Sequence, residues 1–140
     1  MPTLDFAFLA DAAEAEPGRK FYVLGGGIDS IGAQEFPIVH PHLALVMRVM
    51  VHPSEVDRGH QMEIRLMDSD GGELAKLEGQ FSAAAGGGIA GREIPMNMVL
   101  NFMNTRFEFG GDYSIEIMIN NQHMKSLPLR VYIVVGTKND

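Results

Sequence analysis

Apolar and polar residues alternate one by one over long stretches of this 140-residue chain. The clearest stretch runs from His60 to Asp68, in which every second residue is apolar. Successive side chains of a β-strand point to opposite faces, so this period of two predicts strands with one buried face. The segment from Asp68 to Gly72 is rich in turn-forming residues and predicts a hairpin, whose return strand runs from Glu73 to about Ser82.

The C-terminal third predicts a second hairpin. Residues 113–119 and 127–135 alternate in the same way, and the polar segment from Asn120 to His123 separates them. Pro128 indicates that the last strand begins at a sheet edge, because proline cannot donate a hydrogen bond to a neighbouring strand. Further strands are expected at Leu4–Ala10, Phe21–Gly25, Leu43–His52 and Ile94–Met103, with a short one at Phe107–Phe109.

Helical patterns are short. Asp11–Glu16 predicts a turn or two of helix before Pro17, and Pro53–Asp57 predicts a single turn capped by Ser54. Neither is long enough to cover a sheet. We therefore expect one all-β domain over residues 1–140, an antiparallel β-sandwich of seven to nine strands, immunoglobulin-like or jelly-roll-like, with at most one or two short helical turns.

Charge and composition exclude several classes of partner. Eighteen acidic and eleven basic residues give a net charge of −7, which opposes binding to nucleic acid phosphates and to anionic lipids. Apolar runs reach about five residues, whereas a membrane-spanning helix needs roughly 20. The chain has no cysteine for a disulfide and no basic N-terminal region typical of a signal peptide. We expect a cytoplasmic protein without nucleic-acid or membrane partners.

The glycine-rich segment from Tyr22 to Gly32 resembles a phosphate-binding loop in part. Gly27 and Gly32 have the required spacing, but Ala33 and Gln34 follow where such a loop needs lysine and a hydroxyl residue. The segment also misses the Gly-x-Ser-x-Gly spacing of a hydrolase nucleophile. We interpret the glycines as a bulge or a close crossing of two backbones.

Metal-ligand patterns are equally incomplete. His40 and His42 would share one face of a strand and are the candidate metal ligands, but no carboxylate follows before Glu55. We favour a loop that leads into a strand at these histidines. Asp68 begins a segment similar to a calcium loop, yet its twelfth position is Gly79 rather than glutamate. We therefore expect no cofactor and, in the absence of a catalytic constellation, no enzymatic activity.

Several predicted strands are apolar on both faces, and no helix is predicted to cover the second face. Another copy of the chain is the simplest cover, although single apolar residues are also common on protein surfaces. The apolar residues of the second faces are Leu9, Tyr22, Leu24, Val46, Met50, Val99, Met103, Met118, Tyr132 and Val134. All except Leu9 and Val46 are candidate interface residues.

The leading functional hypothesis is a structural or interaction module that self-associates through sheet faces or edges as a homo-oligomer, with an unidentified protein partner as the other option. The alternative is a sandwich that binds carbohydrate or another small ligand, with Tyr22, Tyr113 or Tyr132 stacking on sugar rings. The absence of tryptophan counts against that alternative. A metalloenzyme built on His40 and His42 is the third hypothesis.

Three parts of the sequence carry a resemblance to a known family. They are Phe8–Asp11 with Pro17–Asp29, Phe36-Pro37 with Leu43–Arg48, and Gly111–Ile115 with Pro128–Val131. In these parts the chain resembles an uncharacterised family of short bacterial β-sandwich proteins of similar length. The resemblance implies a fold and no activity, so it assigns no catalytic residue. The C-terminal part is also similar to the last strands of many immunoglobulin-like sandwiches, which concerns the fold alone.

Overall fold

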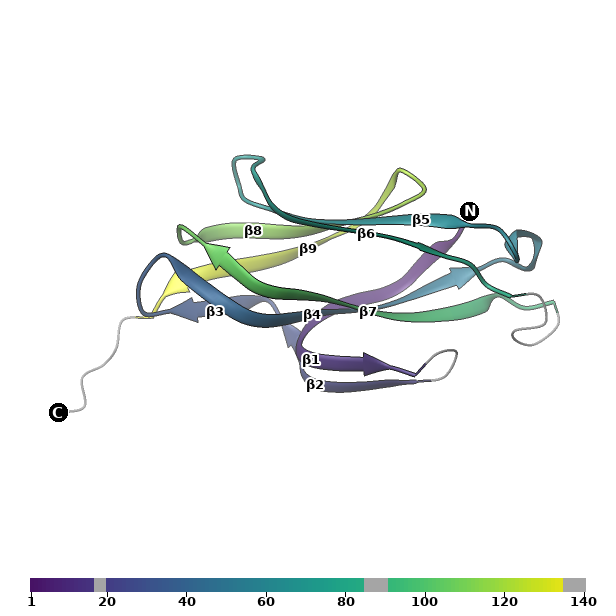
Figure 1. The fold of residues 1–140 in the computed structure, drawn as a ribbon, viewed down its shortest axis with the longest axis horizontal. Helices are drawn as coiled ribbons and strands as arrows, with labels where there is room; N and C mark the ends of the chain where they lie inside the picture. The colour runs from purple at the N-terminus through teal and green to yellow at the C-terminus, as the bar shows by residue number, and fades with distance from the viewer. Residues whose placement is uncertain (17–19, 85–90, 135–140) are drawn as a thin grey trace.

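The computed structural model describes residues 1–16, 20–84 and 91–134, which form two β-sheets packed face to face (Figure 1). The strands are β1 (Thr3–Ala15), β2 (Phe21–Ile28), β3 (Ser30–Ala33), β4 (Ile38–Val51), β5 (His60–Met67), β6 (Glu73–Phe81), β7 (Ile94–Phe107), β8 (Gly111–Ile119) and β9 (Gln122–Ile133). A four-stranded sheet has the order β2-β1-β4-β7, and a five-stranded sheet has the order β3-β9-β8-β5-β6. The predicted all-β sandwich is confirmed, and in the described residues β3 and β9 form its one parallel pair.

The core lies between the sheets and follows the predicted alternation. Every second residue of β5 and β8 points inward, and so does every second residue of the central part of β4. The largest fully buried side chains that these three strands point into the core are Leu43, Leu45, Met47, Ile64, Leu66, Ile115, Ile117 and Ile119. Burial of one such side chain contributes roughly 1.5–3 kcal/mol, which makes this layer the main source of stability.

Two sequence predictions, at the end of β1 and at the start of β4, are wrong. Asp11–Glu16 forms no helix, because β1 continues to Ala15 and pairs there with β2, with Ala13 opposite Val23. The partner strand takes up the backbone hydrogen bonds that a helix would otherwise satisfy locally. β4 begins at Ile38, so His40 and His42 lie within a strand and not in a loop, held by pairing with β7.

The connection after β4 contains the predicted helical turn with a different cap. Pro53–Glu55 forms a 3-10 turn, labelled η1. His52 caps it, since its Nδ1 accepts a hydrogen bond from the backbone N–H of Ser54 at 3.1 Å; the prediction of Ser54 as the cap is wrong. β9 pairs with β8 along most of its length, but with β3 only from Arg130 onward. Pro128 therefore lies before the part of β9 that has a neighbouring strand on both sides.

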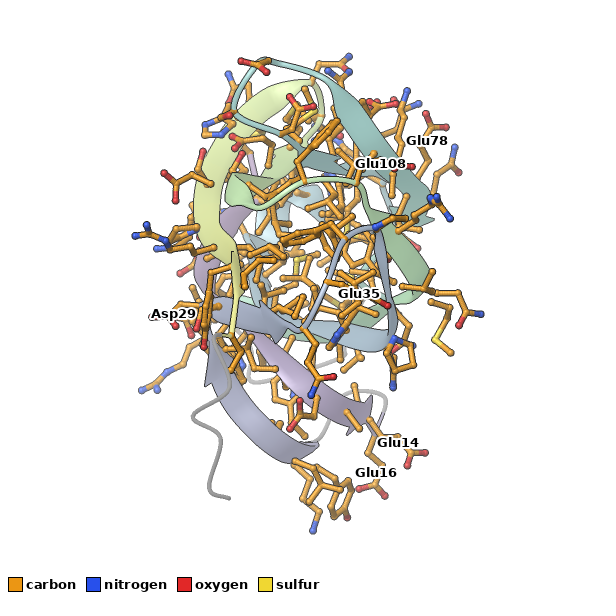
Figure 2. The ribbon with its side chains drawn as sticks, turned by 90° about the vertical axis from the view of Figure 1, so that its left-hand side faces the viewer. Glu14, Glu16, Asp29, Glu35, Glu78 and Glu108 are labelled. Carbon is orange, nitrogen blue, oxygen red and sulfur yellow. The ribbon has the colours of Figure 1, made fainter. Side chains whose placement is uncertain are left out.

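The two sides of the sandwich differ in how the chain passes between sheets. β2 and β3 are consecutive edge strands of the two sheets, so the chain crosses from one sheet to the other at Asp29, on what we call the β2–β3 side. β7 and β6 are the opposite edge strands and approach each other on the β6–β7 side. The β1–β2 hairpin projects from the body, with Glu14 and Glu16 near its free end (Figure 2).

The outer face of the four-stranded sheet carries a second, smaller apolar cluster, which we call the outer cluster. Ala10, Ala44 and Val46 are fully buried there. They are covered by Phe6, Phe8, Ala13, Phe21, Val23 and Val99. The Arg48 guanidinium lies 5.4 Å from the centre of the Phe6 ring and shields it further. The aromatic side chains of β1 and β2 thus cover part of the second apolar face, for which the sequence predicted no cover within the chain.

Candidate interaction surface

The exposed apolar residues of β2 form the strongest candidate surface. Leu24 is 73% exposed and Tyr22 is 54% exposed. They alternate with Phe21 and Val23, which pack into the outer cluster on the other face of the strand. Within the described part of the chain β2 pairs with β1 alone, so its other edge presents unpaired backbone groups beside Tyr22 and Leu24.

Weak polar contacts hold Tyr22 in place without covering it. Its hydroxyl donates to Glu16 Oε2 at 3.4 Å, and the Lys20 ammonium lies 5.6 Å from the centre of its ring. A cation at this distance from an exposed ring contributes about 0.5–1 kcal/mol. The ring is therefore oriented on the surface and remains available to another molecule.

The glycines of β2 allow the hairpin to bend at the sheet edge. Gly25 and Gly27 adopt φ values of 64° and 89°, which side chains disfavour. A Cβ atom on Gly25 would overlap the carboxylate of Asp11, and the β1–β2 register shifts between Leu9 and Ala10 near Gly27. The interpretation as a bulge is thus confirmed, whereas the atoms nearest Gly25 belong to the Asp11 side chain and not to a crossing backbone. Leu9 lies in the core, because a separate register shift of β1 against β4, between Leu4 and Phe6, sets which residues face inward; its assignment to a second apolar face is wrong.

Tyr132 and Val134 lie next to β3 at the end of β9. Tyr132 is opposite Gly32 in the parallel pair, and the backbone N–H of Val134 donates to the Ala33 carbonyl at 2.7 Å. A Cβ on Gly32 would lie 2.6 Å from Val134 Cγ2 and 3.3 Å from Tyr132 Oη, so glycine leaves the room for both side chains. Both are more than two-fifths exposed. Four interface candidates, Tyr22, Leu24, Tyr132 and Val134, thus lie on the β2–β3 side.

The other four interface candidates are separated from this side. Met103 is 60% exposed on β7, an edge strand of the β6–β7 side. Met50 and Val99 are half-buried on β4 and β7, and Val99 packs against the outer cluster. Met118 is half-buried on β8 and lines a groove on the five-stranded sheet. Val46, the remaining apolar residue of a second face, is fully buried.

The candidate metal ligands stand two residues apart on β4. His42 Nε2 lies 2.7 Å from Asn101 Oδ1 on β7, and His40 pairs across the strands with Thr105. In residues 1–16, 20–84 and 91–134 no three His, Asp or Glu side chains are arranged to hold a metal ion. Two of the other three histidines serve local structure: His52 caps η1, and the buried ring of His60 has its centre 5.3 Å from that of Phe81.

A serine, a histidine and a glutamate meet on the outer face of the five-stranded sheet, a grouping that the sequence analysis missed. Ser126 Oγ donates to Glu116 Oε1, and His123 Nε2 lies 2.7 Å from that oxygen and 3.1 Å from Ser126 Oγ. A Ser-His-acid triad uses the two imidazole nitrogens separately, whereas one nitrogen serves both neighbours here. Burial acts to raise the pKa of Glu116, but hydrogen bonds from Ser114, Ser126 and His123 together lower it. These hydrogen bonds therefore stabilise the charged form of Glu116 on the surface of the sheet.

One candidate sugar-stacking residue lies inside the protein. Tyr113 is 6% exposed, its ring packs edge-on against Phe107, and its hydroxyl donates to the Phe109 carbonyl at 2.6 Å. Burial raises the pKa of the Tyr113 hydroxyl. The prediction that Tyr113 stacks on a ligand is therefore wrong, while Tyr22 and Tyr132 remain at the surface.

The fold occurs in solved structures of other proteins. Similar structures are the Pseudomonas fluorescens alkylpurine DNA glycosylase AlkC bound to DNA containing an abasic site analog (TM-score 0.50, 12% identity) and the C-terminal domain of wzt (TM-score 0.52, 13% identity). The first match covers 94% of this chain but 30% of the glycosylase chain, and the second covers 93% and 72%. At such identities the likeness concerns the fold alone.

Sequence comparison gives the family. No curated protein sequence matches the chain. No helix in the described residues has the length and apolar character required to cross a membrane. The model of one family matches residues 5–132, nearly the whole chain. The chain belongs to DUF6941, a family of unknown function.

Proposed function

We propose that this protein is a non-enzymatic interaction module that self-associates through its β2–β3 side. The observation that carries the proposal is the edge of β2 that no described strand pairs with, on a strand in which Leu24 and Tyr22 are 73% and 54% exposed. Unpaired strand edges with exposed apolar side chains are templates for pairing with another chain. Soluble proteins usually block such edges with charges, proline or a bulge. No charge or proline occurs from Phe21 to Ile28, and the bulge of β2 lies at Gly27, beyond Tyr22 and Leu24.

A second copy of the chain is the partner that this edge fits. Two β2 strands can pair antiparallel about a two-fold axis, so that the same edge supplies the donors and acceptors of both partners. Gly25, Gly26 and Gly27 bring no side chains that would obstruct the approaching backbone. Pairing would join two four-stranded sheets into one and would cover the exposed faces of Leu24 and Tyr22.

The experiment compares matched substitutions on the two sides of the sandwich. Leu24→Asp and Tyr22→Asp place a charge on the β2–β3 side, and Met103→Asp places one at a similarly exposed position on β7. Light scattering on a sizing column should give an assembly for the wild type and for Met103→Asp, and 15.3 kDa for the two β2 variants. Circular dichroism verifies that each variant is folded.

Two results would refute the proposal. One is an unchanged particle mass in Leu24→Asp and Tyr22→Asp, which would clear β2 of any role in assembly. The other is dissociation by Met103→Asp alone, which would move the interface to the β6–β7 side.

A further inference from the structure

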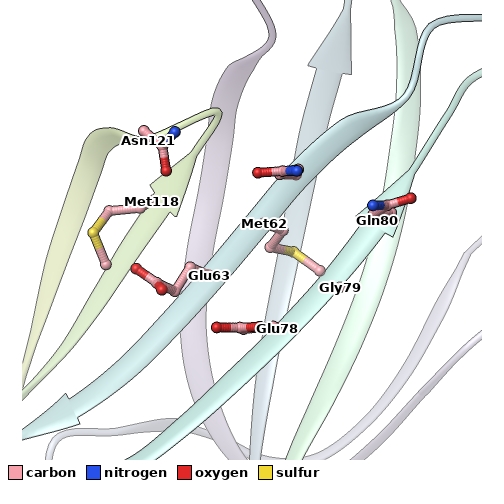
Figure 3. Close-up of a pocket in the computed structure, with 8 residues that line it drawn as sticks. Met62, Glu63, Glu78, Gly79, Gln80, Met118 and Asn121 are labelled. Carbon is pink, nitrogen blue, oxygen red and sulfur yellow. The ribbon is translucent and has the colours of Figure 1, made fainter.

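A polar groove lies on the outer face of the five-stranded sheet, over β5, β6 and β8 (Figure 3). Its volume is about 330 Å³, at the low end of the roughly 300–1,000 Å³ typical of small-molecule sites. The side chains of Gln61, Glu63, Glu78, Gln80, Met118 and Asn121 line it. The β2–β3 side lies at the other edge of this sheet, so the groove is independent of the proposed self-association.

Strand register assembles the groove from pairs of like side chains. Gln61 of β5 lies opposite Gln80 of β6, and Glu63 lies opposite Glu78 two residues further on. Met62 and Gly79 form the pair between them. On the other side of β5, Met118 of β8 is the partner of Glu63. Two amides, two carboxylates and a thioether are thereby placed on one face of three adjacent strands.

Asn121 closes the groove from the turn between β8 and β9. Its backbone adopts a left-handed φ of 64°, which asparagine tolerates better than most residues. The preceding Asn120 fixes this turn, since its Oδ1 accepts a hydrogen bond from the backbone N–H of Gln61 at 2.9 Å. The turn is therefore tied to β5 beside the groove.

The two carboxylates are neutralised within the sheet. Lys76 Nζ lies 3.0 Å from Glu63 Oε1 and 2.9 Å from Glu78 Oε1. Arg65 contacts the other oxygen of Glu63 at 2.9 Å and also lies 3.6 Å from Glu73, which is outside the groove. Each of the two groove carboxylates therefore has a cation beside it, which reduces the attraction of the groove for a free cation. The carboxylate oxygens that remain accessible act as fixed hydrogen-bond acceptors.

We propose that this groove binds one ring of a neutral oligosaccharide. A sugar hydroxyl both donates and accepts hydrogen bonds. The amides of Gln61, Gln80 and Asn121 can do both in return, whereas carboxylates only accept. Met118 offers the apolar surface against which the C–H face of a sugar ring packs. An apolar ligand would leave the amides and carboxylates without partners, which is costly.

The test uses fluorescently labelled full-length protein on an array of bacterial surface oligosaccharides and plant polysaccharide fragments. We expect retention of at least one neutral glycan. Gln61→Ala and Gln80→Ala should each weaken its Kd by about tenfold in calorimetry. Gln34→Ala, at an exposed glutamine between β3 and β4, is the matched control and should bind as the wild type does.

A nuclear magnetic resonance titration maps the site directly. Glucose, galactose, mannose and N-acetylglucosamine are added separately to the ¹⁵N-labelled protein, with glycerol as a control for non-specific hydroxyl contacts. At least one sugar should shift the side-chain amide signals of Gln61, Gln80 and Asn121, and glycerol should not. The proposal is overturned if neither experiment detects binding, or if a glycan binds and both glutamine variants retain wild-type affinity.

Discussion

Glu63 on β5 lies directly opposite Glu78 on β6, although both side chains are carboxylates. Like charges in directly opposed positions destabilise a pair of strands. Lys76, two residues before Glu78 on β6, lies within 3.0 Å of both and compensates the repulsion. Lys76 thereby holds two acidic residues side by side on the surface of the sheet.

Lys76→Met should therefore lower the melting temperature in a pH-dependent manner. The hydrogen bond from Lys76 lowers the pKa of Glu63 below its ordinary value of 4.5. A depressed pKa in the folded state stabilises the protein above 4.5, and this contribution disappears as the pH falls through the lowered pKa. Scanning calorimetry should show a deficit at pH 7 that closes towards pH 3. Lys125→Met, an exposed lysine on β9, is the control; an equal deficit of Lys76→Met at both pH values would contradict the account.

Ile117→Ala tests the position of the core. Ile117 is fully buried on β8, between β5 and β9. Truncation of such a side chain removes apolar contacts and leaves a cavity, which costs about 2–5 kcal/mol. Urea unfolding should show this loss, whereas Val39→Ala, at a residue 49% exposed on β4, should stay within about 0.5 kcal/mol of the wild type. Similar losses in both variants would mean that the core lies elsewhere.

Gly25→Ala tests the bend of the β1–β2 hairpin. The left-handed φ of 64° and the overlap of a new Cβ with the Asp11 carboxylate both oppose alanine. We expect a loss of about 1–2 kcal/mol in chemical unfolding. Gly59→Ala is the matched control, because its Cβ would meet no atom within 4 Å. A Gly25→Ala variant as stable as Gly59→Ala would show that this bend is not required.

Asp68→Ala tests the turn between β5 and β6. Asp68 Oδ1 accepts hydrogen bonds from the backbone N–H groups of Asp70 at 2.9 Å and Gly72 at 2.7 Å. Loss of these acceptors should cost about 1–2 kcal/mol, and Asp68→Asn, which keeps an oxygen there, should recover part of it. Ser69→Ala, in the same exposed turn, serves as the control in urea unfolding. No difference between Asp68→Ala and Ser69→Ala would refute this role.

The sandwich could be predicted from sequence because the alternation of apolar and polar residues within a strand shows which of its faces is buried. The alternation in β5 and β8 correctly predicts which of their residues point inward, among them Met62 on β5 and Ile119 on β8. Local propensity misled at Asp11–Glu16, since alanine and glutamate favour a helix in isolation. Pairing with the next strand, β2, decided the outcome there.

The candidate surfaces were only partly predictable. Tyr22 and Leu24 are apolar residues on a second face and are exposed as expected. Val46 has the same pattern and is buried, because aromatic side chains of β1 and β2 fold over it. The groove depends on the register that sets Gln61 beside Gln80 and Glu63 beside Met118, and one sequence does not reveal strand register.

The central claim is that the β2–β3 side joins two copies of the chain, and the most direct measurement is the solution mass of the wild-type protein. Light scattering on a sizing column, repeated over a hundredfold dilution, should give a multiple of 15.3 kDa that persists or falls reversibly to the single-chain mass. A mass of 15.3 kDa at every concentration would contradict the claim and would leave Leu24 and Tyr22 uncovered by a second copy.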